Sequence, residues 1–279
     1  MAARRSIRHR PALHGAGSLR FAALLFASAL TLVGRAASAH PHDPNDPFAY
    51  FPSDTVSAGD STLVPLRPDH VRWKMWQPGA EEPRLEGTIE QWIAREDTPA
   101  GRRWRVTIER RDAEGPLASR DTIWLTGGAL APIYHAREGA GVSLRLSYEG
   151  RHLSGWMDRG GARLAVDETL RRAAFPHALR GLLFTRLPLA EGYATEIATF
   201  DPGIWVRGGE RRNAVRVLGL EWLRIGHRTR RCWKLALIDR DPAGITETVW
   251  VDRKSRRLLR EERRDARGHA RHRDPAARP

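Results

Sequence analysis

The chain has 279 residues, a formal net charge of +14 and one cysteine, Cys232. A single cysteine excludes an internal disulfide framework. The charge lies mainly at the two ends: residues 1–39 contribute +6 and residues 253–279 contribute +7, which leaves +1 for residues 40–252. Because the body of the chain is nearly neutral, the charge does not indicate a nucleic-acid-binding domain, and no nucleic-acid partner is expected.

Residues 1–39 have the composition of a secretory signal peptide. They contain six arginines and no acidic residue, an apolar run from Phe21 to Val33, and then Ala37-Ser38-Ala39. The run is shorter than the roughly 20 residues that a membrane-spanning helix needs. We therefore expect cleavage after Ala39 and a periplasmic or secreted protein, with a retained membrane anchor as the alternative. No cysteine stands at the cleavage point to carry a lipid.

Two segments without regular periodicity flank the central part of the chain. Residues 40–69 are rich in proline, which predicts an extended linker. Residues 263–279 are mainly basic, which predicts a disordered tail that is either simply solvated or touches anionic lipid. Residues 70–262 are expected to form one antiparallel β domain.

Alternating apolar and polar residues predict strands through most of this domain. Trp104, Val106 and Ile108 alternate with polar neighbours, and Val142 to Tyr148 repeats the pattern, as is typical of strands buried on one face. Gly219 stands where a β-bulge would fit. Beyond an aromatic cluster at 73–76, strands are predicted at 85–92, 103–109, 122–125, 142–148, 151–157, 162–167, 194–200, 204–206, 214–225, 231–239, 246–251 and 258–261.

One amphipathic helix is predicted after Phe175. Phe175, Leu179, Leu182 and Leu183 have the spacing of one helical face, and Pro188 is expected to end the helix. A single helix with one apolar face must cover a sheet. The predicted fold class is therefore mainly β: a single long, curved antiparallel sheet, an open or half barrel, with one short helix on its concave face.

Several segments resemble one family of exported proteins. The run from Thr248 to Arg260, with the later Gly268, resembles the terminal hairpin of periplasmic lipoprotein-carrier domains of the LolA type and their uncharacterised periplasmic relatives. The resemblance implies an unclosed antiparallel barrel with helix over its concave face, where carrier members hold acyl chains. Further landmarks of the uncharacterised relatives are Leu130-Ala131-Pro132, Tyr148-Glu149-Gly150, Leu187 to Tyr193 and Cys232-Trp233.

An open barrel leaves space between its sheet and its helix that an apolar ligand can fill. Large aromatic side chains and the inner face of the helix would provide the lining, although the same side chains can instead fill the core. The candidate lining residues are Trp104, Trp124, Tyr148, Trp156, Leu183, Trp233 and Trp250.

No catalytic residue, metal ligand or cofactor is predicted. His135, His152, His177 and His227 have no carboxylate or second histidine at the spacing of metal ligands, and no nucleophile motif or phosphate-binding loop occurs. The first hypothesis is an exported, non-enzymatic β domain that binds an apolar or acyl ligand in its concave face. The second is an envelope structural or protein-interaction module with a filled core and an exposed sheet edge. A hydrolase of unrecognised type is the third.

Overall fold

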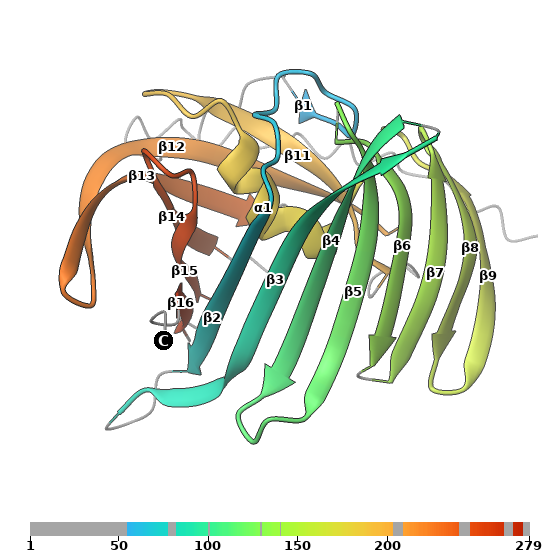
Figure 1. Ribbon diagram of the computed structural model, residues 1–279, viewed down its shortest axis with the longest axis horizontal. Helices are drawn as coiled ribbons and strands as arrows, with labels where there is room; N and C mark the ends of the chain where they lie inside the picture. The colour runs from blue at the N-terminus through green and yellow to red at the C-terminus, as the bar shows by residue number, and fades with distance from the viewer. Residues whose placement is uncertain are drawn as a thin grey trace, which may run out of the picture. The chain divides into compact units, whose positions relative to one another are not determined.

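The computed structural model describes residues 55–77, 82–99, 101–128, 130–139, 141–202, 209–239, 246–264 and 270–275. Sixteen strands form one sheet (Figure 1). The strands are β1 (Thr55–Val56), β2 (Asp69–Gln77), β3 (Arg84–Thr98), β4 (Gly101–Asp112), β5 (Leu117–Thr126), β6 (Pro132–Gly139), β7 (Val142–Glu149), β8 (His152–Arg159), β9 (Ala162–Thr169), β10 (Phe175–Pro176), β11 (Ala194–Phe200), β12 (Glu210–Ile225), β13 (Arg228–Asp239), β14 (Thr246–Asp252), β15 (Leu258–Arg264) and β16 (Ala270–Pro275).

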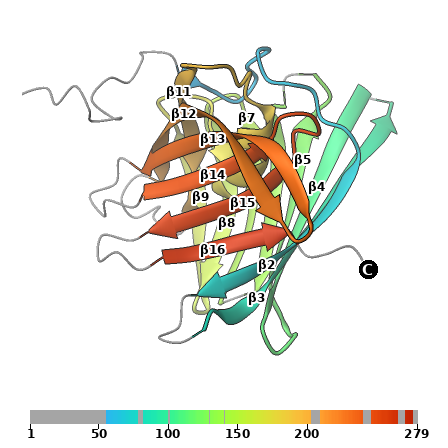
Figure 2. The ribbon, with the colours of Figure 1, turned by 90° about the vertical axis from the view of Figure 1, so that its left-hand side faces the viewer.

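Two antiparallel meanders make up most of this sheet, and the two-residue strands β1 and β10 pair parallel to β11. Strands β2 to β9 pair in sequence order, and so do β11 to β16, while β16 pairs with β2 and joins the two halves. Figure 2 shows β16 lying between β15 and β2. The path of paired strands runs from β1 to β9 without closing, so the predicted open, curved sheet is confirmed.

The strand pattern of the sequence has a direct structural cause. Trp104, Val106 and Ile108 of β4 face the helix side of the sheet. Trp104 and Val106 are buried there in the main core, the apolar cluster that also contains Leu183 and Ile197. The predicted bulge at Gly219 is confirmed, because the register of β12 against β13 shifts between Val217 and Gly219. Gly219 adopts a φ of 141°, which a residue with a side chain rarely takes.

The helix is shorter than its apolar spacing predicts. Phe175 belongs to the short strand β10, a 3₁₀ turn covers His177–Leu179, and α1 covers Arg180–Arg186. The helix ends at Leu187, whose extended backbone (φ −60°, ψ 148°) is the conformation that a following proline imposes. Within the described residues, no helix is both long enough and apolar enough to cross a membrane.

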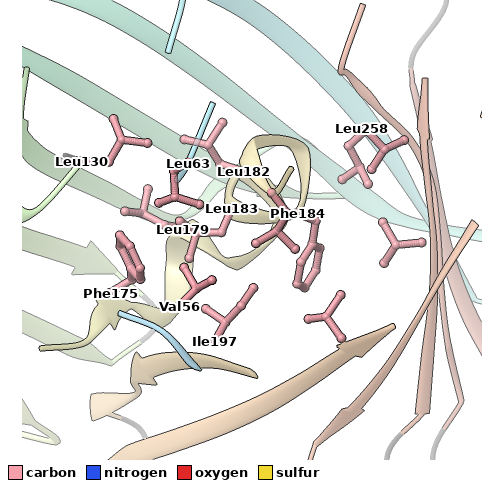
Figure 3. Close-up of a cluster of buried hydrophobic side chains, with 14 of the residues drawn as sticks. Val56, Leu63, Leu130, Phe175, Leu179, Leu182, Leu183, Phe184, Ile197 and Leu258 are labelled. Carbon is pink, nitrogen blue, oxygen red and sulfur yellow. The ribbon is translucent and has the colours of Figure 1, made fainter. Parts of the chain in front are cut away.

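The helix packs its apolar face into the main core. Leu182, Leu183 and Phe184 point toward side chains of the surrounding strands (Figure 3). Val56 of β1 and Leu63 of the following segment lie in the same cluster. Burial of these side chains removes apolar area from water, at about 25 cal/mol per Å². The helix is therefore held on the concave face by the core rather than by its own seven residues.

Arg256 caps the carboxyl end of this helix from another part of the chain. It lies in the turn between β14 and β15 with a φ of 59°, and its Nε donates to the carbonyl oxygen of Thr185 at 3.2 Å. Its Nη2 donates to the carbonyl oxygen of Leu187. These contacts satisfy carbonyls that a helix end leaves without partners inside the helix. Burial lowers the pKa of Arg256.

Replacing Arg256 by alanine is expected to lower the free energy of unfolding by about 2 kcal/mol, because two buried carbonyl groups lose a charged donor. Urea denaturation followed by tryptophan fluorescence measures the change. The matched control is Arg253→Ala in the same turn, where the side chain is exposed and a change within about 0.5 kcal/mol is expected. Equal effects of the two substitutions would contradict the capping role.

The predicted boundaries of the β domain differ from the structure at both ends. Residues 55–68 belong to the predicted linker, yet Thr55–Val56 forms β1 and Leu66 is buried in the described core. Residues 270–275 belong to the predicted disordered tail but form β16. Main-chain pairing with β15 and β2 stabilises β16, and no apolar periodicity in the sequence marks it. The predicted leader and the predicted strand at 204–206 lie outside the described residues.

Cys232 is a buried free thiol on β13, as its apolar surroundings predict. It clusters with Leu223 and Trp250 on the sheet face opposite the main core. Burial and the nearby carboxylates of Asp252 and Glu221 raise its pKa to about 11. The thiol is therefore protonated at neutral pH and chemically inert in the folded protein.

Candidate functional site

A cavity of about 880 Å³ lies between the helix and the concave face of the sheet. Strands β2 to β6 form one side, and β15 and β16 form another. The helix contributes Arg180, Gly181 and Leu182 to the lining, and the 3₁₀ turn contributes His177.

One wall of the cavity is apolar. Strand alternation brings Val71 and Met75 of β2 to the same face as Ile89 of β3 and Ile108 of β4. Leu182 adds to this wall from the helix. Val71, Met75 and Ile108 are only half-buried, whereas the side chains under the helix are almost fully buried. This wall thus leaves apolar area open to solvent.

Other parts of the cavity lining are strongly charged. Arg180 of the helix donates to Glu247 of β14 at 2.8 Å, and Arg263 lies 3.3 Å from the same carboxylate oxygen. Arg273 of β16 pairs with Glu261 of β15, which lies 3.9 Å from Arg180. These ion pairs connect the helix to β14, β15 and β16.

The two carboxylates in this network have opposite pKa shifts. Burial raises the pKa of Glu247, and Glu261 adds to the shift, although Arg180 and Arg263 oppose it. For Glu261, burial would raise the pKa, but Arg273 and Arg180 outweigh it and lower the pKa. Glu261 is therefore the firmly ionised member, held by its guanidinium neighbours.

A second polar cluster lies at β5 and β6. His135 Nε2 is 2.8 Å from the Asp121 carboxylate, and both side chains are buried. Arg137 Nε lies 3.9 Å from the same carboxylate.

His177 of the 3₁₀ turn contacts Thr199 at 3.2 Å, and burial together with the charges of Arg180 and other arginines lowers its pKa well below 6.5. His177 is consequently neutral at neutral pH.

The seven candidate lining residues occupy other places. Three of them, Trp104, Leu183 and Trp233, belong to the main core or pack against it. Tyr148 lies in a second core cluster, and Trp250 lies in the cluster with Cys232.

The remaining two candidates lie beside arginines. Arg105 lies over the ring of Trp124 at 5.8 Å, and Arg163 over that of Trp156 at 4.1 Å. None of the seven candidates lines the cavity. Their role as ligand contacts stays a prediction.

One cavity residue, Arg110, departs from the alternation of apolar and polar residues in its strand. Arg110 follows Trp104, Val106 and Ile108 at the next inward position of β4, where alternation predicts an apolar residue. A charged residue at such a position is either ion-paired inside the core or part of a binding site. No comparable signal exists for Arg273, because β16 has no apolar periodicity.

Three solved structures are similar to this chain, each with 10–12% sequence identity. A Bacteroides fragilis protein, provisionally described as exported and with a YmcC-like fold, has a TM-score of 0.38 at 10% identity and covers 77% of this chain and 98% of its own. A beta-barrel-like protein of the DUF1849 domain of unknown function from Brucella abortus has a TM-score of 0.38 at 10% identity, covering 76% and 97%. A Parabacteroides distasonis protein, provisionally described as a lipoprotein, has a TM-score of 0.32 at 12% identity, covering 77% and 98%.

Comparison with sequence families identifies a wider group for this chain. No curated protein matches it. The family model described as "Protein of unknown function (DUF3108)" matches residues 84–269, which is more than half of the chain. The match spans β3 to β15 and therefore most of the cavity wall. The resemblance to LolA-type carriers stays a prediction. The chain belongs to the DUF3108 family.

Proposed function

We propose that this protein is exported and binds an apolar or acyl ligand in the cavity of its concave face, without catalysing a reaction. The observation that carries the proposal is the cavity of about 880 Å³ beside the helix, with an apolar wall formed by β2, β3 and β4. Sites for small molecules commonly have volumes of about 300–1,000 Å³. An apolar chain on this wall would cover half-buried side chains such as Val71 and Ile108.

Export is supported by the leader. Residues 1–39 combine six arginines, an apolar run too short to span a membrane, and small residues at the expected cleavage position. A cleaved leader would deliver the domain to a compartment where amphiphiles need a carrier through water.

A non-enzymatic role is supported by the bonding of the cavity histidines. The contact between His135 and Asp121 resembles the base-and-carboxylate part of a catalytic triad. Within the described residues, however, His135 Nδ1 has no hydrogen-bond partner, so no hydroxyl or thiol is held against it as a nucleophile. His177 bonds to Thr199, which itself accepts from Asn213 at 3.1 Å.

Native mass spectrometry of the protein purified gently from its own envelope tests the proposal. We expect a protein ion that carries a co-purified lipid or acyl adduct, which organic extraction removes. Repeated lipid-free spectra from gentle preparations would contradict a carrier function.

Filling the cavity is expected to displace the ligand. In an Ile108→Trp variant the larger side chain occupies volume at the apolar wall, and we expect at least about a tenfold loss in affinity for a 16-carbon acyl probe. Equilibrium titration with palmitate measures the loss. The matched control is Thr107→Trp, which adds the same ring to the opposite face of β4 and should leave affinity unchanged. Equal losses in both variants would argue against binding at this wall.

The alternative, an envelope protein-interaction module, is favoured by one observation. Strand β9 ends the described sheet path, and seven of its eight residues are exposed. Such an edge presents unpaired main-chain groups to a partner strand. A reproducible protein adduct in the native spectra, in place of lipid, would favour this alternative.

A further inference from the structure

Arg110 is a cation of the cavity lining for which the described part of the chain provides no ion pair. It lies on β4 at an inward position, beside Ile108, and lines the cavity. Among the described residues it makes neither a hydrogen bond nor an ion pair, although nearby Arg137 and Arg180 each have a carboxylate within 4 Å. The residue as a whole is exposed, so its guanidinium is open to a ligand that enters the cavity.

Other arginines approach Arg110. Its pKa is lowered by burial and by the charges of Arg137 and Arg273, while Asp121 and Glu261 oppose the shift. The lining as a whole contains ten arginines and seven acidic residues. The carboxylates therefore do not balance the positive charge of this cavity.

Two of these neighbouring arginines have unused donors. The Nε atoms of Arg137 and Arg273 are buried and have no hydrogen-bond partner within the described ranges. Each guanidinium nevertheless lies beside a carboxylate: Arg137 Nε is 3.9 Å from Asp121, beyond hydrogen-bond distance, and Arg273 Nη2 donates to Glu261. Buried donors without partners are rare in folded proteins and indicate an absent acceptor.

The apolar wall begins directly beside this cluster. Arg110 pairs with Ile89 across β3 and β4 and follows Ile108 by two residues on the same face of β4. We propose that Arg110, Arg137 and Arg273 bind the anionic head group, a carboxylate or a phosphate, of an amphiphile whose apolar chain lies on Ile89 and Ile108. This inference rests on the proposed function and specifies the chemistry of its ligand. Guanidinium groups suit both anions, because their planar donors match carboxylate and phosphate oxygens.

The test compares probes that differ in one group. Palmitate carries both chain and charge, hexadecanol carries the chain alone, and inorganic phosphate and acetate carry charge alone. Binding to the full protein is measured by equilibrium titration at constant, low salt. We expect palmitate to bind at least about tenfold more tightly than hexadecanol, because charge-assisted hydrogen bonds from guanidinium groups contribute that much.

The variant Arg110→Met keeps the length of the side chain and removes its charge. We expect palmitate affinity to fall about tenfold and hexadecanol affinity to stay unchanged. Arg110→Lys, which keeps the charge, should lose less. Arg105→Met, on the opposite face of β4, is the matched control and should change neither affinity. Thermal unfolding of each variant verifies that it is folded, which is expected since the Arg110 side chain makes no hydrogen bond or ion pair in the described part of the chain.

Each outcome decides between the two proposals. Equal affinities for palmitate and hexadecanol, or a folded Arg110→Met variant with unchanged palmitate binding, would overturn the anion site while leaving the apolar ligand in place. Phosphate binding that is lost in Arg110→Met, without hexadecanol binding, would support the anion site but identify a free anion as its ligand and overturn the apolar-ligand proposal. Failure of every probe to bind would overturn both.

Discussion

Replacing Leu183 by arginine is expected to destabilise the fold by about 4 kcal/mol or more, which is a large share of the stability of a typical domain. Leu183 is 2% exposed and packs in the main core with Phe184 and Ile197. The substitution removes a buried leucine and places a guanidinium among the apolar side chains of the main core. Chemical denaturation followed by tryptophan fluorescence measures the loss, and poor recovery of folded protein is the expected consequence.

The matched control for this substitution is Leu164→Arg on β9. Leu164 is 40% exposed, so the same change of residue should alter stability by no more than about 0.5 kcal/mol. If Leu183→Arg were as stable as this control, the packing of the helix against the sheet would be wrong. Because Leu183 lies in the core rather than in the cavity lining, loss of ligand in its arginine variant would report unfolding.

Removing Arg180 is the second substitution with a large expected effect. In Arg180→Met the Glu247 carboxylate, which is 3% exposed, loses its 2.8 Å partner and keeps Arg263 at 3.3 Å. A buried charge left without its partner costs about 3 kcal/mol. We expect that loss in the free energy of unfolding. The double variant Arg180→Met/Glu247→Gln removes the charge as well and should recover part of it.

The stability lost in Arg180→Met is expected to depend on pH. Burial already raises the pKa of Glu247 above 4.5, and loss of Arg180 removes a charge that opposes this shift. A carboxyl group with a raised folded-state pKa binds its proton more tightly when folded, so its contribution favours folding at low pH and is lost as pH rises through the folded pKa. The stability deficit of Arg180→Met should therefore shrink between about pH 8 and about pH 5. A deficit that stays constant, or grows on acidification, would contradict a buried carboxylate that has lost its nearer partner.

The cavity and the core compete for the same kinds of side chain, and this competition limits what the sequence can predict about the site. Trp104 and Ile108 occupy equivalent inward positions on β4 and are four residues apart. The first is in the core and the second faces the cavity. Alternation assigns both to the same face of the sheet, but only the position of the helix decides which of them is covered.

Local patterns determined much of this fold. Alternation predicted the strands around Trp104 and Val142, because successive side chains of a strand point to opposite faces of the sheet. Pro188 marked the end of the helix and Gly219 marked the bulge, because both depend on local backbone preferences. The number of strands relative to helix then indicated one curved sheet.

Only the tertiary structure decided where the cavity lies and which charges line it. Arg110 and Arg273 are separated by more than 160 residues, and the electrostatic effect of one on the other arises because β16 pairs with β2. Such pairing depends on main-chain hydrogen bonds and on distant partners such as Glu261, which leave no periodic signal in the sequence. The sequence by itself thus determined the sheet and its helix, while long-range strand pairing decided the site.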